Sequence, residues 1–297
     1  MTNIMPRAQV HNIEIEYDTF GDPTSKPLLL IMGLGGQMIA WQDELCETLV
    51  NRGFYVIRFD NRDVGLSTKF EEAGMPNLLE LFAKIERGES IQVPYTLEDM
   101  ADDAIGVLDD LNIEKAHICG ASMGGMIAQV IAYRHPSRVL TLTSIMSSTG
   151  NPELPQVSRE LRRELFRPYP TDREAFIKEG VRRGRLIYGS YPYDEERAYE
   201  LRAKTYDRCF YPEGTIRQQA AIAATGNRKP NLSSINIPTL VIHGREDPLL
   251  PVEGGIDTAE AIPGAELLII ERMGHSMPLE VVPQIIDALV ANTDKIK

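Results

Sequence analysis

Residues 120–125 read Gly-Ala-Ser-Met-Gly-Gly, and they separate a short apolar run, 115–119, from a segment with helical spacing, 126–134. A Gly-x-Ser-x-Gly pentapeptide at a strand-to-helix turn is the pattern of a nucleophile elbow. The sharp turn exposes the serine oxygen, and the small flanking residues relieve the crowding that the turn creates. The pattern predicts Ser122 as a nucleophile. A glycine-rich turn without a chemical role is the alternative, so the rest of the chain must be searched for partner groups.

Apolar strands alternate with helices along most of the chain. Continuous apolar runs, which are typical of strands covered on both faces, occupy residues 27–32, 54–59, 139–146, 239–243 and 266–270. Helical spacing occupies residues 41–52, 96–111 and 278–291, and apolar and polar residues alternate at 10–20 as in an antiparallel edge strand. This order predicts an α/β fold: a mostly parallel sheet with helices on both faces and functional loops at the carboxyl ends of the strands.

Residues 151–230 interrupt this alternation. They contain no convincing strand, and they hold 16 of the 31 lysines and arginines and seven of the eleven tyrosines. We expect an inserted helical cap here, with residues 1–150 and 231–297 forming the core domain. A cap of this kind excludes water from a site at the strand ends and shapes its pocket. Its formal charge is +4 against −16 for the rest of the chain, which predicts attraction through weak surface ion pairs.

Composition limits the classes of partner. The formal net charge of −12 disfavours nucleic acid and anionic membranes, because both would be repelled. No apolar run approaches the roughly 20 residues that span a bilayer, and the polar start has no signal-peptide pattern, so we expect a cytoplasmic protein. Three widely spaced cysteines without a C-x-x-C pattern indicate neither a disulfide framework nor a zinc site, and no metal is predicted.

Five histidines are candidates for the base that a serine nucleophile needs. His11 falls in the edge strand, His117 lies within the strand before the elbow, and His135 ends the helix after it. His243 closes a strand and is interpreted as a packing residue beneath the acid loop. His275 stands in the loop after the last strand, where the base of this arrangement is expected. We therefore predict His275 as the general base.

The imidazole in turn needs a carboxylate that fixes its tautomer and stabilises the imidazolium form. Asp247 directly follows a buried strand, so its side chain can be held at the strand ends, and Pro248 fixes the backbone beside it. Glu246 is the competing acid. We prefer Asp247, which gives the chain order Ser122, Asp247, His275.

An oxyanion forms during acyl transfer and needs two N–H donors. Met123 offers one at the start of the helix after the serine. The glycine loop at residues 33–36 follows the strand 27–32, and by position we predict the N–H of Leu34 as the second donor. A tight turn without a catalytic role is the alternative. The loop does not form G-x-G-x-x-G, so no dinucleotide or other cofactor is predicted.

Two further stretches carry a family resemblance. Residues 31–36, Ile-Met-Gly-Leu-Gly-Gly, and residues 59–67, Phe-Asp-Asn-Arg-Asp-Val-Gly-Leu-Ser, resemble the α/β-hydrolase superfamily, in the branch that contains aclacinomycin methylesterase and related carboxylesterases. The likeness extends over nearly the whole chain. It implies an α/β-hydrolase fold and a triad of the elbow serine, the aspartate of the segment 243–248 and the histidine of the segment 274–275.

The resemblance also implies roles for single residues. The family's oxyanion donors correspond to Leu34 and Met123, while Asp60, Arg62 and Ser67 match a pattern that is mostly structural. One departure concerns the oxyanion loop, because many relatives have His-Gly where this chain has Met-Gly at residues 32–33.

The function expected from these features is hydrolysis of a small-molecule carboxylic ester through an acyl-enzyme. A serine nucleophile argues against haloalkane dehalogenase and epoxide hydrolase chemistry, which use an aspartate. Lactone opening, carbon–carbon bond hydrolysis, perhydrolysis and cyanohydrin cleavage remain open on the same triad. A non-catalytic ligand receptor of the same fold is the alternative from another class, and the intact triad disfavours it.

Overall fold

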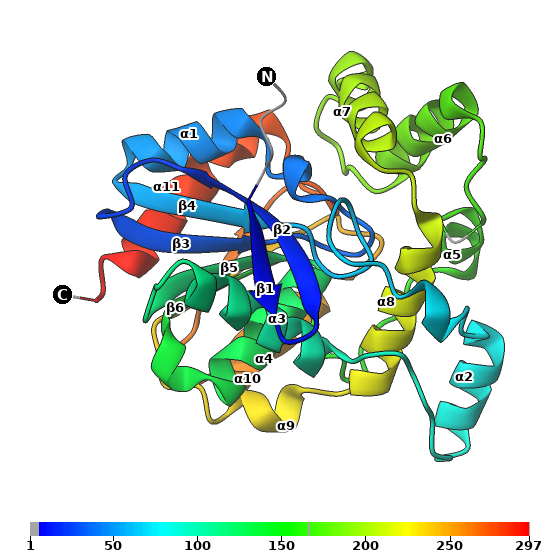
Figure 1. Ribbon diagram of the computed structural model, residues 1–297, viewed down its shortest axis with the longest axis horizontal. Coiled ribbons are helices and arrows are strands. Elements are labelled where there is room, and N and C mark those ends of the chain that lie inside the picture. Colours follow the sequence, from blue (N-terminus) through cyan, green and yellow to red (C-terminus); the bar gives the residue numbers. More distant parts are fainter. Residues whose placement is uncertain (1–5, 166, 297) are drawn as a thin grey trace.

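The computed structural model describes residues 6–165 and 167–296. Its centre is an eight-stranded sheet in the order β1-β2-β4-β3-β5-β6-β7-β8 (Figure 1). The first two strands are antiparallel to their neighbours, and the other six run parallel. The strands are β1 (Arg7–Val10), β2 (Ile13–Phe20), β3 (Lys26–Ile31), β4 (Phe54–Phe59), β5 (Ala116–Ala121), β6 (Val139–Ile145), β7 (Thr239–Gly244) and β8 (Glu266–Ile270).

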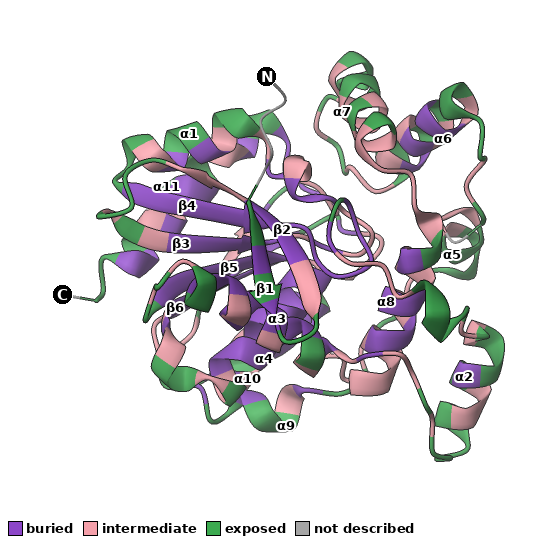
Figure 2. Cartoon of the chain, viewed as in Figure 1, coloured by how far each residue is buried: buried purple, intermediate pink, exposed green. Residues whose placement is uncertain are grey.

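Each central strand buries both of its faces, as its continuous apolar run predicts. In β3, Leu28 and Leu30 pack against α1 (Asp43–Asn51) and α11 (Val282–Thr293) on one side of the sheet. Leu29 and Ile31 alternate to the other side, where α3 (Leu97–Asp110) and α4 (Met123–Arg134) lie. Each fully buried leucine stabilises the fold by about 1.5–3 kcal/mol, and truncation to alanine costs about 2–5 kcal/mol. Figure 2 shows this burial along the strands.

The start of α3 follows directly from its sequence. Thr96 is the N-cap residue, and its hydroxyl accepts a hydrogen bond from the backbone N–H of Asp99 at 3.4 Å. The Asp99 carboxylate accepts one in return from the N–H of Thr96 at 2.7 Å. This capping box satisfies two backbone donors that the first turn leaves free, and losing such a cap costs about 1 kcal/mol.

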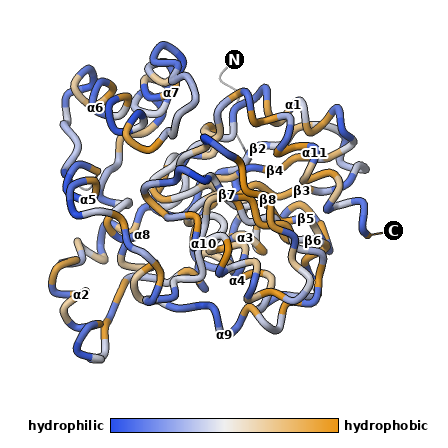
Figure 3. The backbone as a smooth tube through the Cα atoms, turned by 180° about the vertical axis from the view of Figure 1, so that it is seen from behind, coloured by the Kyte–Doolittle hydropathy of each residue, from blue (hydrophilic) through white to orange (hydrophobic). Residues whose placement is uncertain are grey.

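A helical segment lies between β6 and β7, as predicted. It contains α5 (Arg159–Leu165), α6 (Arg173–Leu186), α7 (Glu195–Arg208) and α8 (Pro212–Thr225). Helices α6 and α7 pack together beside the sheet domain, and they are far more hydrophilic than strands β3 to β8 (Figures 1 and 3). Helix α8 is different, because it buries Gln218, Ala220 and Ala221 and packs against α3. The expectation of a mostly parallel sheet with helices on both faces is confirmed.

The chain leaves and re-enters the sheet domain at neighbouring points. A Cβ atom on Gly150 would lie 2.4 Å from the carbonyl oxygen of Gly226. Arg228 is buried beside both crossings, and its guanidinium donates to the carbonyl oxygens of Ser148 at 2.8 Å and Gly226 at 2.9 Å. Its backbone N–H donates to Thr149. The two connections are therefore fastened together.

Two helices, at residues 78–86 and 253–261, have no counterpart among the sequence-based predictions. Helix α2 (Leu78–Glu86) projects from the molecule next to α8, and Leu81 is its buried residue (Figure 1). The remaining short elements are α9 (Lys229–Leu232), α10 (Glu253–Ala261) and the 3-10 helices η1 (Met38–Ala40), η2 (Glu71–Ala73), η3 (Pro136–Arg138) and η4 (Leu279–Val281). Among the helices of residues 6–165 and 167–296, none is both long and apolar enough to cross a membrane.

Candidate active site

The turn between β5 and α4 holds Ser122 in a strained conformation. Its φ of 57° and ψ of −120° are rare for a residue with a side chain. The flanking glycines make this turn possible: a Cβ on Gly120 would lie 2.0 Å from the carbonyl oxygen of Gly124, and one on Gly124 would lie 2.0 Å from that of Ile31. The elbow therefore needs glycine at both positions, and it presents the serine hydroxyl at the carboxyl end of β5.

The structure brings Ser122, Asp247 and His275 together in one line. Nε2 of His275 lies 2.9 Å from Oγ of Ser122, and Nδ1 of His275 lies 2.7 Å from Oδ2 of Asp247. These distances lie within hydrogen-bonding range, and they join a hydroxyl to a carboxylate through both ring nitrogens. The three side chains come from the loops after β5, β7 and β8.

The Asp247 carboxylate is held ionised. Its Oδ1 accepts backbone N–H groups from Leu249 and Leu250, each at 2.9 Å. Burial by itself would raise the pKa of Asp247, but the interactions of its carboxylate with the imidazoles of His275 and His243 lower the pKa well below its ordinary value. The carboxylate is thus a fixed acceptor for Nδ1 of His275 at neutral pH.

Glu246 and His243, which lie close to Asp247 in the sequence, are not part of the hydrogen-bonded line from Ser122 to Asp247. Glu246 points to the surface, where its carboxylate accepts a hydrogen bond from Ser190 at 2.5 Å. His243 is fully buried below Asp247, with Nε2 at 2.8 Å from the carbonyl oxygen of Leu250 and at 3.5 Å from Oδ2 of Asp247. Its position is that of a packing residue beneath the acid loop.

The loop that carries His275 is bound to the inserted segment. The backbone N–H of His275 donates to the carbonyl oxygen of Ile187 at 2.6 Å, and the N–H of Gly274 donates to that of Tyr188 at 3.1 Å. Both acceptors follow α6. The position of the imidazole therefore depends on the inserted helices as well as on the sheet.

The glycine loop after β3 lies against the serine. A Cβ on Gly33 would lie 3.0 Å from Cβ of Ser122 and 3.6 Å from its Oγ. The loop closes as a turn, in which the N–H of Gly36 donates to the carbonyl oxygen of Gly33 at 3.0 Å, and Asn61 Nδ2 donates to the carbonyl oxygen of Met32 at 2.9 Å. These two hydrogen bonds fix the conformation of the loop in this chain, which has Met-Gly at residues 32–33. Met123 begins α4 next to the serine, so its N–H is one of the free donors of a helix N-terminus.

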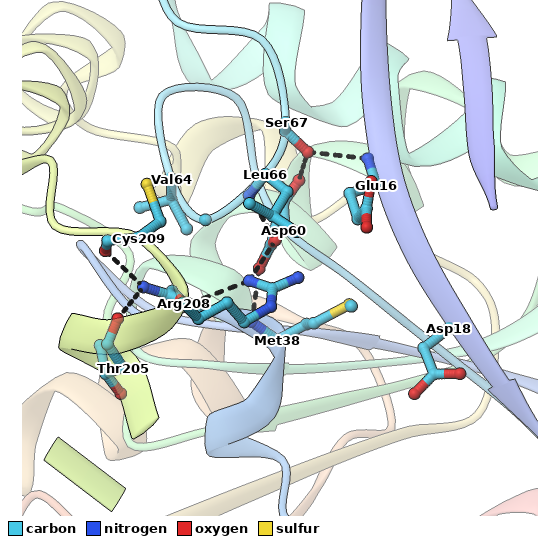
Figure 4. Close-up of polar contacts among 12 residues, drawn as sticks. Glu16, Asp18, Met38, Asp60, Val64, Leu66, Ser67, Thr205, Arg208 and Cys209 are labelled. Carbon is cyan, nitrogen blue, oxygen red and sulfur yellow. Dashed lines mark hydrogen bonds and ion pairs between the residues drawn. The ribbon is translucent and has the colours of Figure 1, made fainter. Parts of the chain in front are cut away.

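The segment after β4, residues 60–67, lies next to the glycine loop and is held by buried polar contacts. Asp60 is fully buried and accepts hydrogen bonds from the backbone N–H groups of Met38 at 2.8 Å and Leu66 at 2.9 Å (Figure 4). The hydroxyl of Ser67 donates to the carbonyl oxygen of Asp60 at 2.6 Å. Arg62 pairs with Asp103 through two bonds of 2.6 and 2.7 Å.

Two buried ion pairs join this segment to the inserted helices. Arg208 at the end of α7 reaches Asp60, with Nη1 at 2.6 Å from Oδ2 (Figure 4). Arg217 of α8 binds both carboxylate oxygens of Asp63, at 2.8 and 3.0 Å. The charge balance predicted attraction through weak surface pairs, but these two pairs are buried. Composition reports only net charge, and nothing in the local sequence marks which arginine reaches which aspartate.

An open parallel sheet with a serine at a strand-to-helix turn, facing a histidine and a buried aspartate, is the arrangement of an α/β hydrolase. The chain belongs to the α/β hydrolase fold family, which matches residues 26–280. It is 31% identical to rhodomycin D methylesterase DnrP of Streptomyces peucetius, over 97% of this chain and 98% of that protein. The predicted resemblance to methylesterases of this superfamily is confirmed, and so is the prediction of an enzyme of the carboxylic ester hydrolase class.

More distant relatives carry other activities in their names. The chain is 26% identical to 3-oxoadipate enol-lactonase 2 of Acinetobacter baylyi, over 88% of this chain and 86% of that protein. Among solved structures it resembles a meta-cleavage product hydrolase from Pseudomonas fluorescens IP01, with a TM-score of 0.76, 22% identity and 98% of each chain covered. The second likeness concerns the fold alone.

Proposed function

We propose that the protein is a serine hydrolase that cleaves a carboxylic ester through an acyl-enzyme. The observation that carries this proposal is the continuous hydrogen-bonded line from Ser122 Oγ through His275 to Asp247, with distances of 2.9 and 2.7 Å. In this proposal Ser122 is the nucleophile, His275 the general base and Asp247 the residue that orients it. The N–H groups of Leu34 and Met123 stabilise the oxyanion.

Acylation uses His275 twice, first as a base and then as an acid. His275 Nε2 takes the hydroxyl proton while Ser122 Oγ bonds to the carbonyl carbon of the ester, and the carbonyl electrons move onto its oxygen. The two N–H donors stabilise that oxyanion, and losing one typically costs about 3 kcal/mol of barrier lowering. The imidazolium then gives its proton to the leaving alkoxide as the carbon–oxygen bond breaks, which releases the alcohol and leaves the acyl group on Ser122.

Deacylation repeats the steps with water as the nucleophile. His275 takes a proton from water, the hydroxide bonds to the acyl carbon, and the second oxyanion occupies the same two donors. Its collapse breaks the bond to Ser122, whose oxygen regains a proton from His275. The ionised Asp247 supports the imidazolium in both half-reactions, which fits its lowered pKa.

The relatives favour a methyl ester as the first substrate class to test. DnrP is named as a methylesterase, and it aligns with nearly the whole of this chain. Opening of a lactone is the second candidate, because the Acinetobacter relative is named as an enol-lactonase and a lactone is an internal ester. Both reactions use the same attack of a serine on an ester carbonyl.

We further propose that residues 151–230 form a cap that shapes the substrate pocket over this site. Two observations support it: the hydrophilic pair α6 and α7, and the hydrogen bonds that the His275 loop donates to the carbonyl oxygens of residues 187 and 188. Replacing residues 151–230 by a short Gly/Ser linker should reduce discrimination between acyl chain lengths more than it reduces labelling of Ser122 by a small probe. An unchanged chain-length preference, with circular dichroism showing a folded protein, would contradict the proposed role of the cap.

The central experiment combines labelling with turnover. A fluorophosphonate probe should label the wild type at Ser122, and a panel of p-nitrophenyl esters, aryl methyl esters and lactones should be hydrolysed at rates that identify the substrate class. Ser122→Ala should abolish both labelling and turnover. Ser276→Ala is the matched control, because it also removes a serine hydroxyl next to His275. The Ser276 hydroxyl makes only a long hydrogen bond, 3.4 Å, to the carbonyl oxygen of Tyr188. Labelling at another residue, or turnover by Ser122→Ala, would refute the assignment.

A further inference from the structure

The middle of the oxyanion loop is held from α8, far away in the sequence. The N–H of Gly35 donates to Oε1 of Gln218 at 2.8 Å. Gly35 has a φ of 64° and occupies the third position of the turn that Gly33 and Gly36 close. Its peptide directly follows Leu34, whose N–H is the proposed oxyanion donor. Gln218 therefore contacts the loop one peptide away from that donor.

The side-chain amide of Gln218 uses both of its ends. While Oε1 accepts from Gly35, Nε2 donates to the carbonyl oxygen of Arg62 at 2.9 Å. The side chain is fully buried. A rotated amide would place a donor against the N–H of Gly35 and an acceptor against the carbonyl of Arg62, so the surroundings allow one orientation. An amide with one allowed orientation holds its partner in one position.

The atoms that hold Gln218 are themselves fixed. The Arg62 guanidinium pairs with Asp103 on α3 and stacks on the rings of Phe70 and Tyr95. One turn before Gln218 on the same helix, Thr215 packs on the loop, because a Cβ on Gly35 would lie 2.6 Å from its Oγ1. The loop thus rests on a helix that is tied to the sheet domain.

We infer that Gln218 is a positioning residue for the oxyanion hole: it fixes the Gly35 peptide and, through it, the direction of the Leu34 N–H. The inference rests on the proposed function, since it takes Leu34 as an oxyanion donor. An oxyanion hole stabilises charge only when its donors are held in place before the reaction. Gln218 supplies that restraint from the inserted helical segment without touching the substrate.

The first test replaces Gln218 by methionine, which keeps the length and apolar bulk of the side chain and removes both hydrogen bonds. Removing an oxyanion donor lowers kcat about 100- to 1000-fold, and a loosened donor should have a smaller effect. We expect kcat to fall roughly 10- to 100-fold with KM within about twofold of the wild type. The affinity for phenylboronic acid should fall in parallel, because its tetrahedral adduct with Ser122 places an oxygen in the oxyanion hole.

The matched control is Asn292→Leu. Asn292 is also a buried side-chain amide that donates to a backbone carbonyl, that of Leu142 at 3.1 Å, but it lies on α11. Its loss should lower the melting temperature while leaving kcat and the boronate affinity of the folded enzyme unchanged. Equal losses of boronate affinity in both variants, or none in Gln218→Met, would overturn the inference.

A second variant, Gln218→Glu, provides a test by pH. A protonated carboxyl group can accept from Gly35 and donate to Arg62 as the amide does, whereas the carboxylate repels the Arg62 carbonyl. Because burial raises the pKa of a carboxyl group, we expect the ratio of variant to wild-type boronate affinity to rise at least fivefold from pH 8 to pH 5. A ratio that does not change with pH would overturn the inference. If Gln218→Met fails to fold, Gln218→Glu alone tests the inference.

Failure of the proposed function is distinguishable from failure of this inference. If the wild type binds phenylboronic acid at Ser122 but hydrolyses no ester or lactone, the proposed reaction is wrong and the boronate affinities still decide the role of Gln218. If the wild type hydrolyses esters and Gln218→Met matches it in kcat and boronate affinity, the proposed reaction stands and the inference is refuted.

Discussion

Replacing Arg208 by methionine tests how strongly the buried pair with Asp60 stabilises the fold. The side chain of Arg208 is 13% exposed and that of Asp60 is fully buried, with 2.6 Å between Nη1 and Oδ2. Methionine keeps much of the side-chain length, and the carboxylate keeps its bonds to Met38 and Leu66. Removing one partner of a buried pair typically costs about 3–5 kcal/mol. Because two donors remain, we expect the free energy of unfolding to fall by about 3 kcal/mol, at the low end of that range.

The assay is equilibrium unfolding in urea, followed by the fluorescence of Trp41, the single tryptophan of the chain, which is buried. For a chain of this length a loss of 3 kcal/mol corresponds to a melting temperature about 5 °C lower. Arg173→Met is the matched control, because Arg173 also makes a paired contact with an aspartate, Asp207, but both side chains are exposed. It should unfold like the wild type.

The outcome of the comparison is decisive. If Arg208→Met and Arg173→Met unfold at the same urea concentration as the wild type, the buried pair adds nothing that an exposed pair lacks, and the reasoning is wrong. A double variant with Asp60→Ala gives a second check. The effect of Arg208→Met should shrink in that background, because the carboxylate that it leaves unpaired is gone.

Three further predictions concern single residues. Asp247→Asn should lower kcat about 10⁴-fold by favouring the wrong imidazole tautomer, while Glu246→Gln stays near wild type in the same ester assay; the reverse result would move the acid to Glu246. His117 is buried, and desolvation lowers its pKa from 6.5 to about 4, so the unfolded chain binds a proton that the native state excludes and stability falls as pH drops through this range. Urea unfolding should show a loss of about 2 kcal/mol from this group between pH 7 and pH 5, which His117→Phe removes; an equal loss in the variant would refute it. Gly124→Ala should destabilise the protein by about 2 kcal/mol or more, because the added Cβ meets the carbonyl of Ile31, and a melting temperature equal to that of the wild type would contradict the packing at the elbow.

Local pattern accounts for the elements that the sequence predicted well. The strand at 54–59 matches β4 in both limits, since a buried strand is visible as a continuous apolar run. The strand at 266–270 also matches β8 in both limits, but the expected burial of both faces is wrong there, because β8 is the last strand of the sheet and only Ile270 is buried. The helix after the elbow was predicted from 126, but α4 begins at Met123. Gly124 and Gly125 are poor helix formers, but both are helical here, where Gly124 lies close to the backbone of Ile31 and Gly125 lies close to the side chains of Ser144 and Ser147. Helix α2 was not predicted, and its apolar side chains are largely exposed, among them those of Leu79 and Phe82.

The residues of the candidate site also fall into two groups, those that a local sequence pattern marks and those that it does not. The elbow, the acid and the base each follow an apolar strand, and this position in the chain led to the prediction of Ser122 and His275. Pro248 and the family pattern led to the preference for Asp247 over Glu246. The residues that hold the site in place had no such signal. Gln218 lies 183 positions from Gly35, and a glutamine in a helix gives no indication of what it contacts across the fold. Only the packing of α8 on the sheet domain reveals that contact.

The contact between Gly150 and Gly226 bears on how this enzyme class diversifies. The ends of the intervening segment already touch, so the sheet does not depend on how long that segment is. The entropy of closing a loop grows slowly, by about 0.6 kcal/mol for each doubling of its length. A longer, shorter or foreign set of helices can therefore be grafted between these two glycines while the strand order stays intact. Under the cap role proposed above, exchange of this one segment would change the substrate range, provided that the new helices again supply an acceptor for Gly35 and cations for Asp60 and Asp63.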